Sequence, residues 1–455
     1  MKRRLLLYFA LVAALALAAS LALVLAAGCG SKKSTLTSTS GSHAPVTITV
    51  WHPWTVSSEK KGFENAVAGF RQQYPWITLK IVPYPNSDEF DTNLIKNINA
   101  GTPPDVMISF GPDYVGKYAA DNLLIDLKPY MDRDSFAMDQ FAPAALSYTA
   151  FQGKQVALPV LTDAYGLYYN KDMFAKAGIS SPPKTMSELM ADAQKLTVRN
   201  ADGTIAVAGF VPLLDFNEIG PADLAHAWGG TYFDADGKPH IGTDPAWASA
   251  LTWQKQLVDW YGYSAITDFY GTYVDKEWTS QQAFETGKVA MCWDGEWRTA
   301  MIANDKANVN YGTAPFPAAD DHTEMYGSGR VGGTITGIPR GAQHPDEAWL
   351  LVKYLSTSTD FLVSLANGLG NVPTTKASAA SPALHLVPQF QTFIDVWNNA
   401  KSGFSPPLTA TGSGYADILN SFDEKWVSGK VSDLQAGLTQ VDTDIANQLA
   451  LGTGP

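Results

Sequence analysis

The chain has 455 residues, of which 45% are hydrophobic, and its formal net charge is −12 at pH 7. A chain of this length exceeds what a single hydrophobic core usually serves, so two compact units are expected. The acidic balance argues against nucleic acid and other polyanions as ligands, and no nucleic-acid partner is expected.

The N-terminal segment, residues 1–28, has the pattern of a secretory signal peptide. Three basic residues at positions 2–4 precede an uncharged, almost wholly apolar run over 5–27. The run ends in LAAGC, where small residues precede Cys29, and this pattern resembles the lipobox at which bacterial lipoproteins are cleaved and acylated. We therefore predict a lipid anchor at Cys29. The alternative is an uncleaved signal anchor, because about 20 apolar residues can span a bilayer.

Residues 29–44 are predicted to form a flexible tether, because SKKSTLTSTSGSHA has almost no apolar content with which to build a core. As a random coil this stretch would span roughly 20 Å. The other cysteine of the chain is Cys292. A lipidated Cys29 therefore leaves no intrachain disulfide and no cysteine-rich zinc site.

The folded part begins with a predicted strand–helix–strand unit. VTITV at 46–50 and ITLKI at 77–81 alternate as strands do, and apolar residues recur at helical spacing between 63 and 74. This order predicts a parallel sheet with a right-handed crossover. A second helix is expected over 90–98, followed by a buried strand in PDVMISF at 104–110.

Several further patterns are structural. Thr185 and Glu188 have the spacing of a capping box at a helix start. NADGT and DADGK predict turns, and their carboxylates are too few for a calcium loop. GSGRVG at 327–332 precedes a strand-like segment instead of following one, so it does not predict a dinucleotide site. No cofactor and no metal site are expected.

Five segments, taken in order, resemble the bacterial extracellular solute-binding proteins of ABC importers, especially the carbohydrate-binding branch that includes maltose-binding protein. They include AFETGKVAMCWDGEW and the strand before HPDEAWLLVKYLS. The resemblance implies a periplasmic-binding-protein-like α/β fold, with two discontinuous lobes, a hinge and a ligand cleft between the lobes. The five segments are 100–131, 151–179, 283–297, 311–317 and 344–356.

The same resemblance implies where the chain passes between the lobes. The implied crossings lie near Pro159–Thr162, Val331–Thr334 and Pro373–Lys376. We therefore expect an N-terminal lobe formed by 45–160 plus 333–375 and a C-terminal lobe formed by 161–332 plus 376–455. Ligands of α/β sheets gather at the carboxyl ends of strands, which agrees with a cleft between the lobes.

The stretch MCWDGEW sets Trp293 and Trp297 beside Asp294 and Glu296. Two carboxyl groups flanking one bond are what a glycosidase needs, and in an extended segment these two would emerge about 7 Å apart on one side. The resemblance instead matches Trp297 to a ligand-facing tryptophan, with both acids accepting from sugar hydroxyls. An indole face stacks on the apolar face of a pyranose. We therefore expect binding and no catalytic residue.

Other binding candidates follow from the resemblance, on loops at strand ends. Trp54 follows the first strand, and Phe110 and Asp113 follow the strand at 104–110, where a turn with an N-cap is an equal alternative for FGPD. After the first crossing the resemblance indicates Asp163 and Tyr165. The remaining implied contacts are Phe216 (with Asn217), Gly332, Gly333 and Tyr415. For Trp247, Trp253 and Trp349, on helical faces, core packing is the prediction.

Taken together, the pattern predicts an extracellular or periplasmic lipoprotein, anchored at the cell membrane and monomeric. It would capture a sugar or oligosaccharide and deliver it to the membrane subunits of an ABC permease. Two alternatives stay open. One is a receptor for glycerol phosphate, a polyamine or a peptide, and the other is a secreted glycosidase.

Overall fold

The computed structural model describes residues 43–55, 57–84, 87–404 and 406–451. The predicted signal peptide, its Cys29 and most of the tether lie outside these residues. Residues Pro45–Pro455 form one compact unit. Among the described residues, no helix is both long and apolar enough to cross a membrane.

A parallel sheet opens the fold, as predicted. β1 (Val46–His52) pairs in parallel with β2 (Ile77–Pro83) on one side and β3 (Val106–Ser109) on the other. The crossovers are formed by α2 (Ser57–Ala66) with α3 (Ala68–Gln73), and by α4 (Ser87–Asn99). The one predicted helix over 63–74 is thus two helices that meet at Val67.

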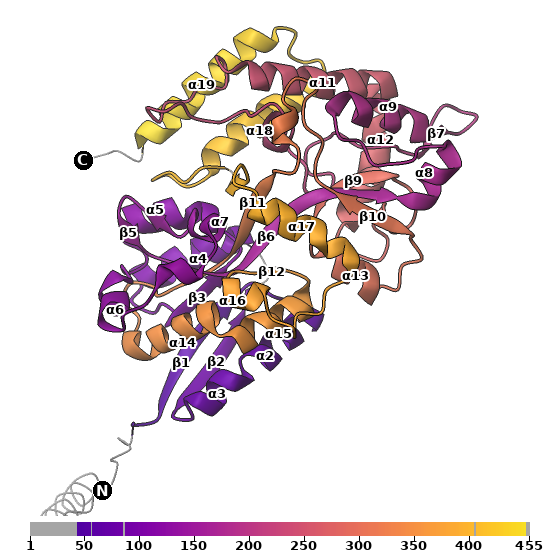
Figure 1. Cartoon of the computed structure of the whole chain (residues 1–455). Coiled ribbons are helices and arrows are strands. Elements are labelled where there is room, and N and C mark those ends of the chain that lie inside the picture. The colour runs from indigo at the N-terminus through magenta and orange to yellow at the C-terminus, as the bar shows by residue number, and fades with distance from the viewer. Residues whose placement is uncertain (1–42, 56, 85–86, 405, 452–455) are drawn as a thin grey trace, which may run out of the picture. The chain divides into compact units, whose positions relative to one another are not determined.

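Two strands extend from this sheet into the second half of the molecule (Figure 1). We use this term for the part whose core is built mainly from residues 164–331 and from those after 371. β11 (Arg330–Gly337) is antiparallel to both β3 and β6 (Leu158–Asn170). Beyond Ala164, β6 pairs instead with β9 (Met291–Gly295) and β10 (Tyr311–Ala314). β12 (Val372–Pro373) joins β6, and β13 (Gly403–Phe404) joins β11. The main strand order is β10-β6-β11-β3-β1-β2.

Helices cover the sheet in both halves of the molecule (Figure 1). Around β1–β3 lie α5 (Val115–Ala120), α6 (Lys128–Arg133), α7 (Pro143–Leu146), α14 (Pro345–Thr357), α15 (Thr359–Leu369) and α16 (Lys376–Ala379). Around β9 and β10 lie α8 (Lys171–Ala177), α9 (Met186–Leu196), α10 (Pro221–His226), α11 (Pro245–Tyr261), α12 (Tyr263–Tyr273), α13 (Arg298–Asn304), α17 (Gln391–Asn398), α18 (Gly414–Val427) and α19 (Leu434–Ala450).

The structure contains the local features that short sequence patterns predicted. Thr185 and Glu188 form the capping box of α9. NADGT joins β7 (Val198–Arg199) to β8 (Ile205–Val207), and a second small hairpin pairs β4 (Ala150–Phe151) with β5 (Lys154–Gln155). The tryptophans predicted to be core are buried, namely Trp247, Trp253 and Trp349.

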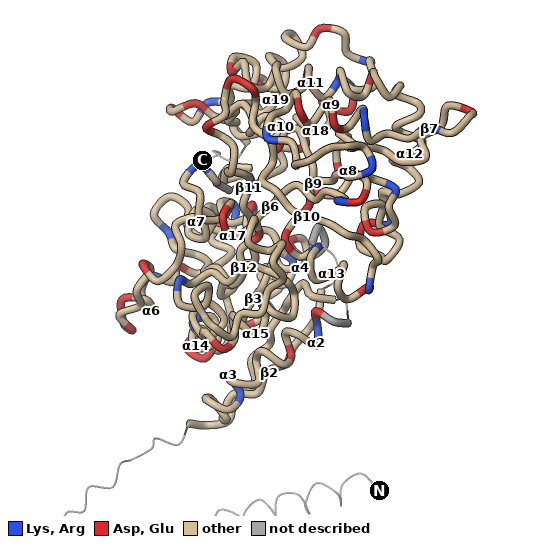
Figure 2. Tube along the Cα trace, turned by 45° about the vertical axis from the view of Figure 1, so that its right-hand side comes forward, with Lys and Arg blue, Asp and Glu red and all other residues tan. Residues whose placement is uncertain are grey.

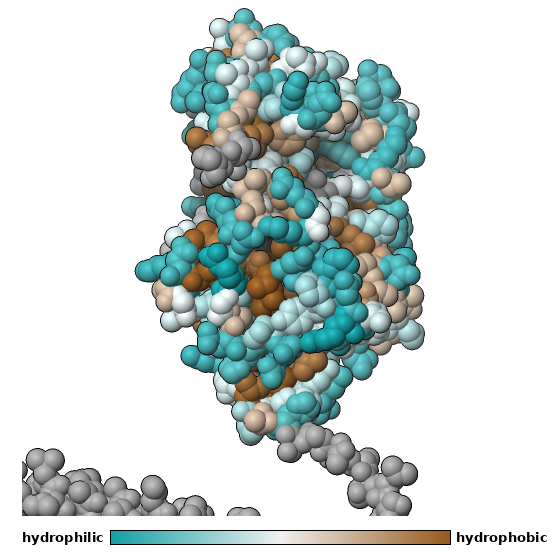
Figure 3. Space-filling model, turned by 90° about the vertical axis from the view of Figure 1, so that its left-hand side faces the viewer, coloured by the Kyte–Doolittle hydropathy of each residue, from teal (hydrophilic) through white to brown (hydrophobic). Residues whose placement is uncertain are grey.

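The buried apolar residues separate into distinct cores. Two clusters take residues from 48–161 and 335–369. A third takes Ala142, residues from 164–331, and those from Val372 onward. The chain therefore changes core along β6, along β11 and just before β12. A surface view shows hydrophilic atoms surrounding separate hydrophobic patches (Figure 3).

Candidate functional site

The three segments in which the chain changes core lie side by side. Thr162 of β6 pairs with Gly333 of β11 and with Val372 of β12. A Cβ on Gly333 would lie 2.3 Å from the Tyr148 Oη and 2.4 Å from the Leu161 carbonyl oxygen. Only glycine permits this approach, which brings the strands together at the centre of the molecule.

We call the place where β6, β11 and β12 meet the junction. Two predicted binding residues from the first half lie there. The register pairs Ser109 with Ile335, so Phe110, the next residue, lies beside the crossing in β11. The Phe110 side chain is 45% exposed, and Trp54 packs edge-on beneath it with ring centroids 6.0 Å apart. Trp54 itself is buried. Phe110 therefore presents the ring and Trp54 supports it.

Asp113 lies in the short turn Pro112–Tyr114, at a contact between the two halves. The Ser413 hydroxyl, just before α18, donates to the Asp113 carboxylate. The N-cap alternative for FGPD is wrong, because no side chain caps this turn.

An aromatic group from the second half meets the same junction. Gly295 pairs with Tyr165, which places Trp297 just beyond β9. The Trp297 ring lies edge-on to Tyr165 at 5.4 Å and stacks on Trp278 at 6.1 Å. Trp278 is 54% exposed, whereas Trp293 is buried against Phe316. Trp278 and Trp297 thus form an aromatic surface, and Trp293 stacks on Tyr165 beside it at 6.3 Å.

Arg330 braces Tyr165 from the side. Its guanidinium carbon lies 3.8 Å from the centre of the Tyr165 ring, a close cation–π contact. The Nε donates to Asp223 Oδ1 at 3.0 Å and the Nη2 donates to the Glu218 carbonyl at 2.8 Å. Tyr165 is therefore held in one orientation on the edge of the aromatic surface.

Asp163 and Glu296 meet on the amide of Asn371. The Asn371 Nδ2 donates to Asp163 Oδ1 at 2.8 Å and to Glu296 Oε1 at 2.9 Å. The other oxygen of Glu296 accepts from the Ala164 N–H at 2.8 Å. Glu296 is fully buried. Asp163 lies at the strand crossing, because its Oδ2 is 3.8 Å from the position that a Cβ on Gly332 would take.

Asp294 has a different environment from the one expected. It is fully buried, and its Oδ2 accepts from the Arg298 Nε at 2.8 Å and from the Asn217 Nδ2 at 3.0 Å. The Oδ1 accepts from the Gly295 N–H at 2.8 Å. Both oxygens are therefore engaged within the protein, so Asp294 supports the loop instead of facing solvent.

Two other candidates pack in the core of the second half. Phe216 is buried beside Phe269 and Tyr270. Tyr415 is buried, and its hydroxyl donates to the Pro407 carbonyl at 2.5 Å. Neither ring lies at the junction of β6, β11 and β12. His52, at the end of β1, is buried and packs on Phe63.

Acidic residues gather where β6, β10 and β11 meet (Figure 2). Burial raises the pKa of Glu218 to about 7, against the opposing effect of Arg330. Burial, together with the negative charge of Asp294, raises the pKa of Glu277 to about 9. Within the described ranges, no group of three or more His, Cys, Asp or Glu side chains could hold a metal ion.

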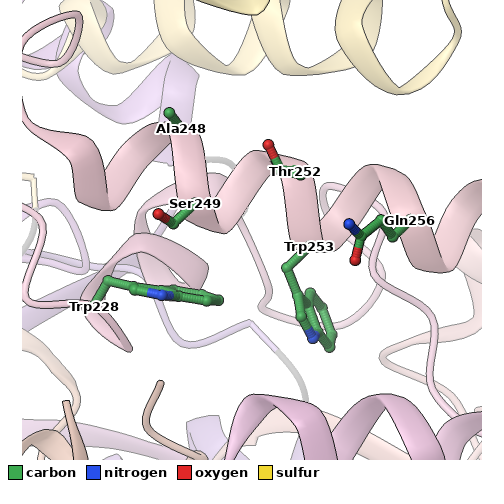
Figure 4. Close-up of a pocket in the computed structure, with 6 residues that line it drawn as sticks. All are labelled: Trp228, Ala248, Ser249, Thr252, Trp253 and Gln256. Carbon is green, nitrogen blue, oxygen red and sulfur yellow. The ribbon is translucent and has the colours of Figure 1, made fainter. Parts of the chain in front are cut away.

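Two hollows lie in the second half. A shallow one of about 420 Å³ lies along α11 and is lined by Trp228, Ala248, Ser249, Thr252, Trp253 and Gln256 (Figure 4). It is formed by none of the predicted binding residues. The second, of about 250 Å³, lies between α10 and β13 and is lined by Asp223, His226, Tyr232, Arg330 and Lys401. Arg330 therefore separates this hollow from Tyr165.

Four residues of the junction were missed from the sequence: Trp278, Asn371, Arg330 and Glu218. A tryptophan in KEWTS, a polar stretch between α12 and β9, was the available signal for Trp278. The other three act through contacts with residues 75 or more positions away, which no local pattern predicts.

The sequence matches the family of bacterial extracellular solute-binding proteins over residues 55–360. The chain belongs to this family. The family consists of extracellular binding proteins and not of enzymes, as predicted. One similar protein is a maltotriose-binding protein of Pyrococcus abyssi, 24% identical over 88% of this chain and 82% of the relative. Another is a probable ABC transporter-binding protein of Deinococcus radiodurans, 27% identical over 62% of this chain and 65% of the relative.

Solved solute-binding proteins share the fold. CpMnBP1 with mannotriose bound superposes with a TM-score of 0.78 at 24% identity, covering 88% of this chain and all of that chain. The GacH receptor of Streptomyces glaucescens, solved unliganded and with acarbose, gives 0.71 at 22% identity, covering 90% of this chain and 99% of that chain. The predicted two-lobed α/β fold is thereby confirmed.

Proposed function

We propose that this solute-binding protein captures a sugar or short oligosaccharide outside the cell and delivers it to the permease of an ABC importer. The observation that carries the proposal is the aromatic surface of Trp278 and Trp297 beside buried, fixed carboxyl groups. Indole faces stack on sugar rings, while carboxylates and amides accept or donate to hydroxyls. The maltotriose-binding relative and the mannotriose-bound neighbour support a carbohydrate ligand.

The proposed contacts come from both halves of the molecule. Phe110 and Asp113 contribute from the first half, and Asp163, Tyr165 and Trp297, with Trp278, contribute from the second. Gly332 and Gly333 allow the backbone to approach the ligand. Four of the remaining predicted residues support these from behind: Trp54, Trp293, Asp294 and Glu296. Phe216 and Tyr415 belong to the core of the second half.

The mechanism we propose is closure of two lobes about the crossings in β6, β11 and β12. The lobes would comprise 45–160 plus 333–375 and 161–332 plus 376–455. A ligand that touches both lobes binds the closed state more tightly and shifts the equilibrium toward it. The permease would then recognise the closed state.

We further propose that the mature protein is a monomer held at the outer face of the membrane by a lipid on Cys29. Support comes from the small residues before Cys29 and from the polar tether over 31–44. The extracellular character of the family agrees with export across the membrane.

A titration of the purified protein with defined solutes tests this function. Maltotriose, mannotriose and maltose are compared with spermidine and glycerol 3-phosphate by thermal shift, where a ligand at 100 times its Kd adds about 2.7 kcal/mol. We expect stabilisation by at least one sugar and a smaller scattering radius in its presence. Stabilisation by spermidine or glycerol phosphate alone would favour a different solute. Release of shorter sugars would identify a glycosidase.

A further inference from the structure

Three chain segments near the strand crossings meet on one cluster of polar side chains, in which Glu296 is buried and the other two are partly buried. Asp163 lies on β6, Glu296 follows β9, and Asn371 precedes β12. The single Nδ2 of Asn371 donates to both carboxyl groups, at 2.8 Å and 2.9 Å. One amide nitrogen therefore holds two acids close together at the point where the chain passes between its cores.

Glu296 cannot turn away from this arrangement. Its Oε2 accepts from the Ala164 N–H at 2.8 Å, and its own N–H donates to the Ala164 carbonyl at 3.2 Å. Ala164 is the residue next to Asp163, so both the backbone and the side chain of Glu296 are tied to the strand that carries Asp163. The separation of the two carboxyl groups is thus set by the strand itself.

The surroundings of the pair offer little compensating positive charge. Arg330 on β11 is the cation that faces Asp163, but its guanidinium is shared with Asp223 and Glu218. Glu218 adds a further carboxyl group, and the other titratable neighbours are Tyr148, Tyr165 and Tyr168. Two like charges held on one amide nitrogen, one of them fully buried, cannot both be ionised at ordinary cost.

We propose that Glu296 is a positioning residue that keeps a proton at neutral pH and donates it to Asp163, while Asn371 bridges the two. The shared proton would hold Asp163 in place as a carboxylate acceptor for the ligand. This inference rests on the proposed function, in which Asp163 touches the sugar. It adds that binding is coupled to one proton at the hinge.

The pKa values of the two acids are shifted in the direction that a shared proton requires. Burial, followed by the charge of Asp163, raises the pKa of Glu296 well above its usual range. Burial raises the pKa of Asp163 to about 6, although the hydrogen bonds from Asn371 and Glu296 oppose the rise. Asp163 therefore ionises first, and the remaining proton stays on Glu296.

A two-sided pH dependence follows. As pH rises through about 6, Asp163 becomes the carboxylate that accepts from a hydroxyl, and affinity rises. When Glu296 loses its proton at higher pH, the two carboxylates repel each other and affinity falls. Because both folded-state pKa values are raised, the stability that the pair contributes is complete below the unfolded carboxyl pKa. It is lost as pH rises through the folded values.

Glu296→Gln is the central test, because glutamine retains an acceptor for the Ala164 N–H and replaces the carboxyl proton with a fixed N–H, at the cost of the acceptor for Asn371. In the ligand-free protein at pH 7, the infrared difference spectrum between the unaltered protein and Glu296→Gln should contain the protonated carboxyl band of Glu296, while the band of Glu277 is common to both. Isothermal titration with maltotriose from about pH 5 to about pH 10 should give a bell-shaped affinity profile. In Glu296→Gln the fall at high pH should disappear and the rise near pH 6 should remain.

Two further variants make the test specific. Asn371→Leu removes the hydrogen bonds that favour the ionised forms of Asp163 and Glu296. The protonated carboxyl band in the infrared spectrum should therefore persist to higher pH than in the unaltered protein. Asp423→Asn removes a buried carboxyl group on α18 whose pKa is raised to about 7, and it should leave the maltotriose profile unchanged. The Asn371→Leu result decides the proposal if Glu296→Gln does not fold.

The proposal is overturned if Glu296→Gln and the unaltered protein have the same carboxyl spectrum, or the same pH profile of binding. The infrared measurement needs no ligand. Failure of maltotriose and every other sugar to bind would therefore reject the proposed function while the proton on Glu296 is still decided.

Discussion

Arg298 donates from its Nε to the Oδ2 of Asp294 at 2.8 Å, four residues back along the chain, and both side chains are fully buried. The guanidinium also contacts Glu285 at 3.2 Å, and its carbon lies 5.8 Å from the centre of the Trp278 ring. The acid in MCWDGEW that looked like half of a catalytic pair therefore anchors the loop that carries the aromatic surface.

We expect Asp294→Ala to destabilise the protein by about 3–5 kcal/mol, because it leaves the buried guanidinium of Arg298 with Glu285 as its one remaining carboxylate partner. Urea unfolding measures the loss. The matched control is Asp259→Ala, which breaks the exposed pair with Lys255 on α11 and should cost less than about 1 kcal/mol. Equal losses in the two variants would show that the buried pair has no special role.

Trp278→Ala should weaken sugar binding by at least about 1 kcal/mol, close to a fivefold rise in Kd, because it removes an exposed ring from the proposed stacking surface. Titration calorimetry with the best sugar of the panel provides the measurement. Trp260→Ala removes another exposed indole, 40% accessible and packed under Arg199. That control should leave Kd unchanged, and a similar loss in both variants would argue against a specific surface.

Gly333→Ala should destabilise the protein by about 1–3 kcal/mol, since the new methyl group overlaps the Tyr148 hydroxyl and the Leu161 carbonyl at the crossing. Thermal unfolding reports the change. Gly271→Ala on α12 adds a methyl group with no atom within 4 Å, and should be neutral or stabilising because alanine favours helices. If Gly333→Ala behaves like this control, the close approach is not rigid.

Cys29→Ser should release the protein from membranes or leave its signal uncleaved, because serine has no thiol to acylate. Fractionation of cells, followed by mass analysis of the N-terminus, detects either result. A chain beginning at His43 should fold and bind as the full protein does, since Pro45–Pro455 is a compact unit. An unaltered protein whose own N-terminus is uncleaved and unacylated would indicate a signal anchor.

Local patterns in the sequence determined much of the architecture. The alternation in 46–50 and 77–81 marked β1 and β2, and the Thr185–Glu188 spacing marked the start of α9. Helical spacing was also enough to assign Trp247 and Trp349 to the core. These features depend on neighbours within a turn or two of the chain, so the physical cause is contained in a short window.

The roles of individual acids and rings were decided only by the tertiary structure. Asp294 and Glu296 are two residues apart, yet one is neutralised by Arg298 and the other meets Asp163 and Asn371. The partners of Glu296 lie 132 and 75 positions away in the chain. Whether a carboxyl group stays ionised depends on burial and on the charges within a few ångströms of it. Sequence spacing does not specify those distances, because the folding of β6, β9 and β12 sets them.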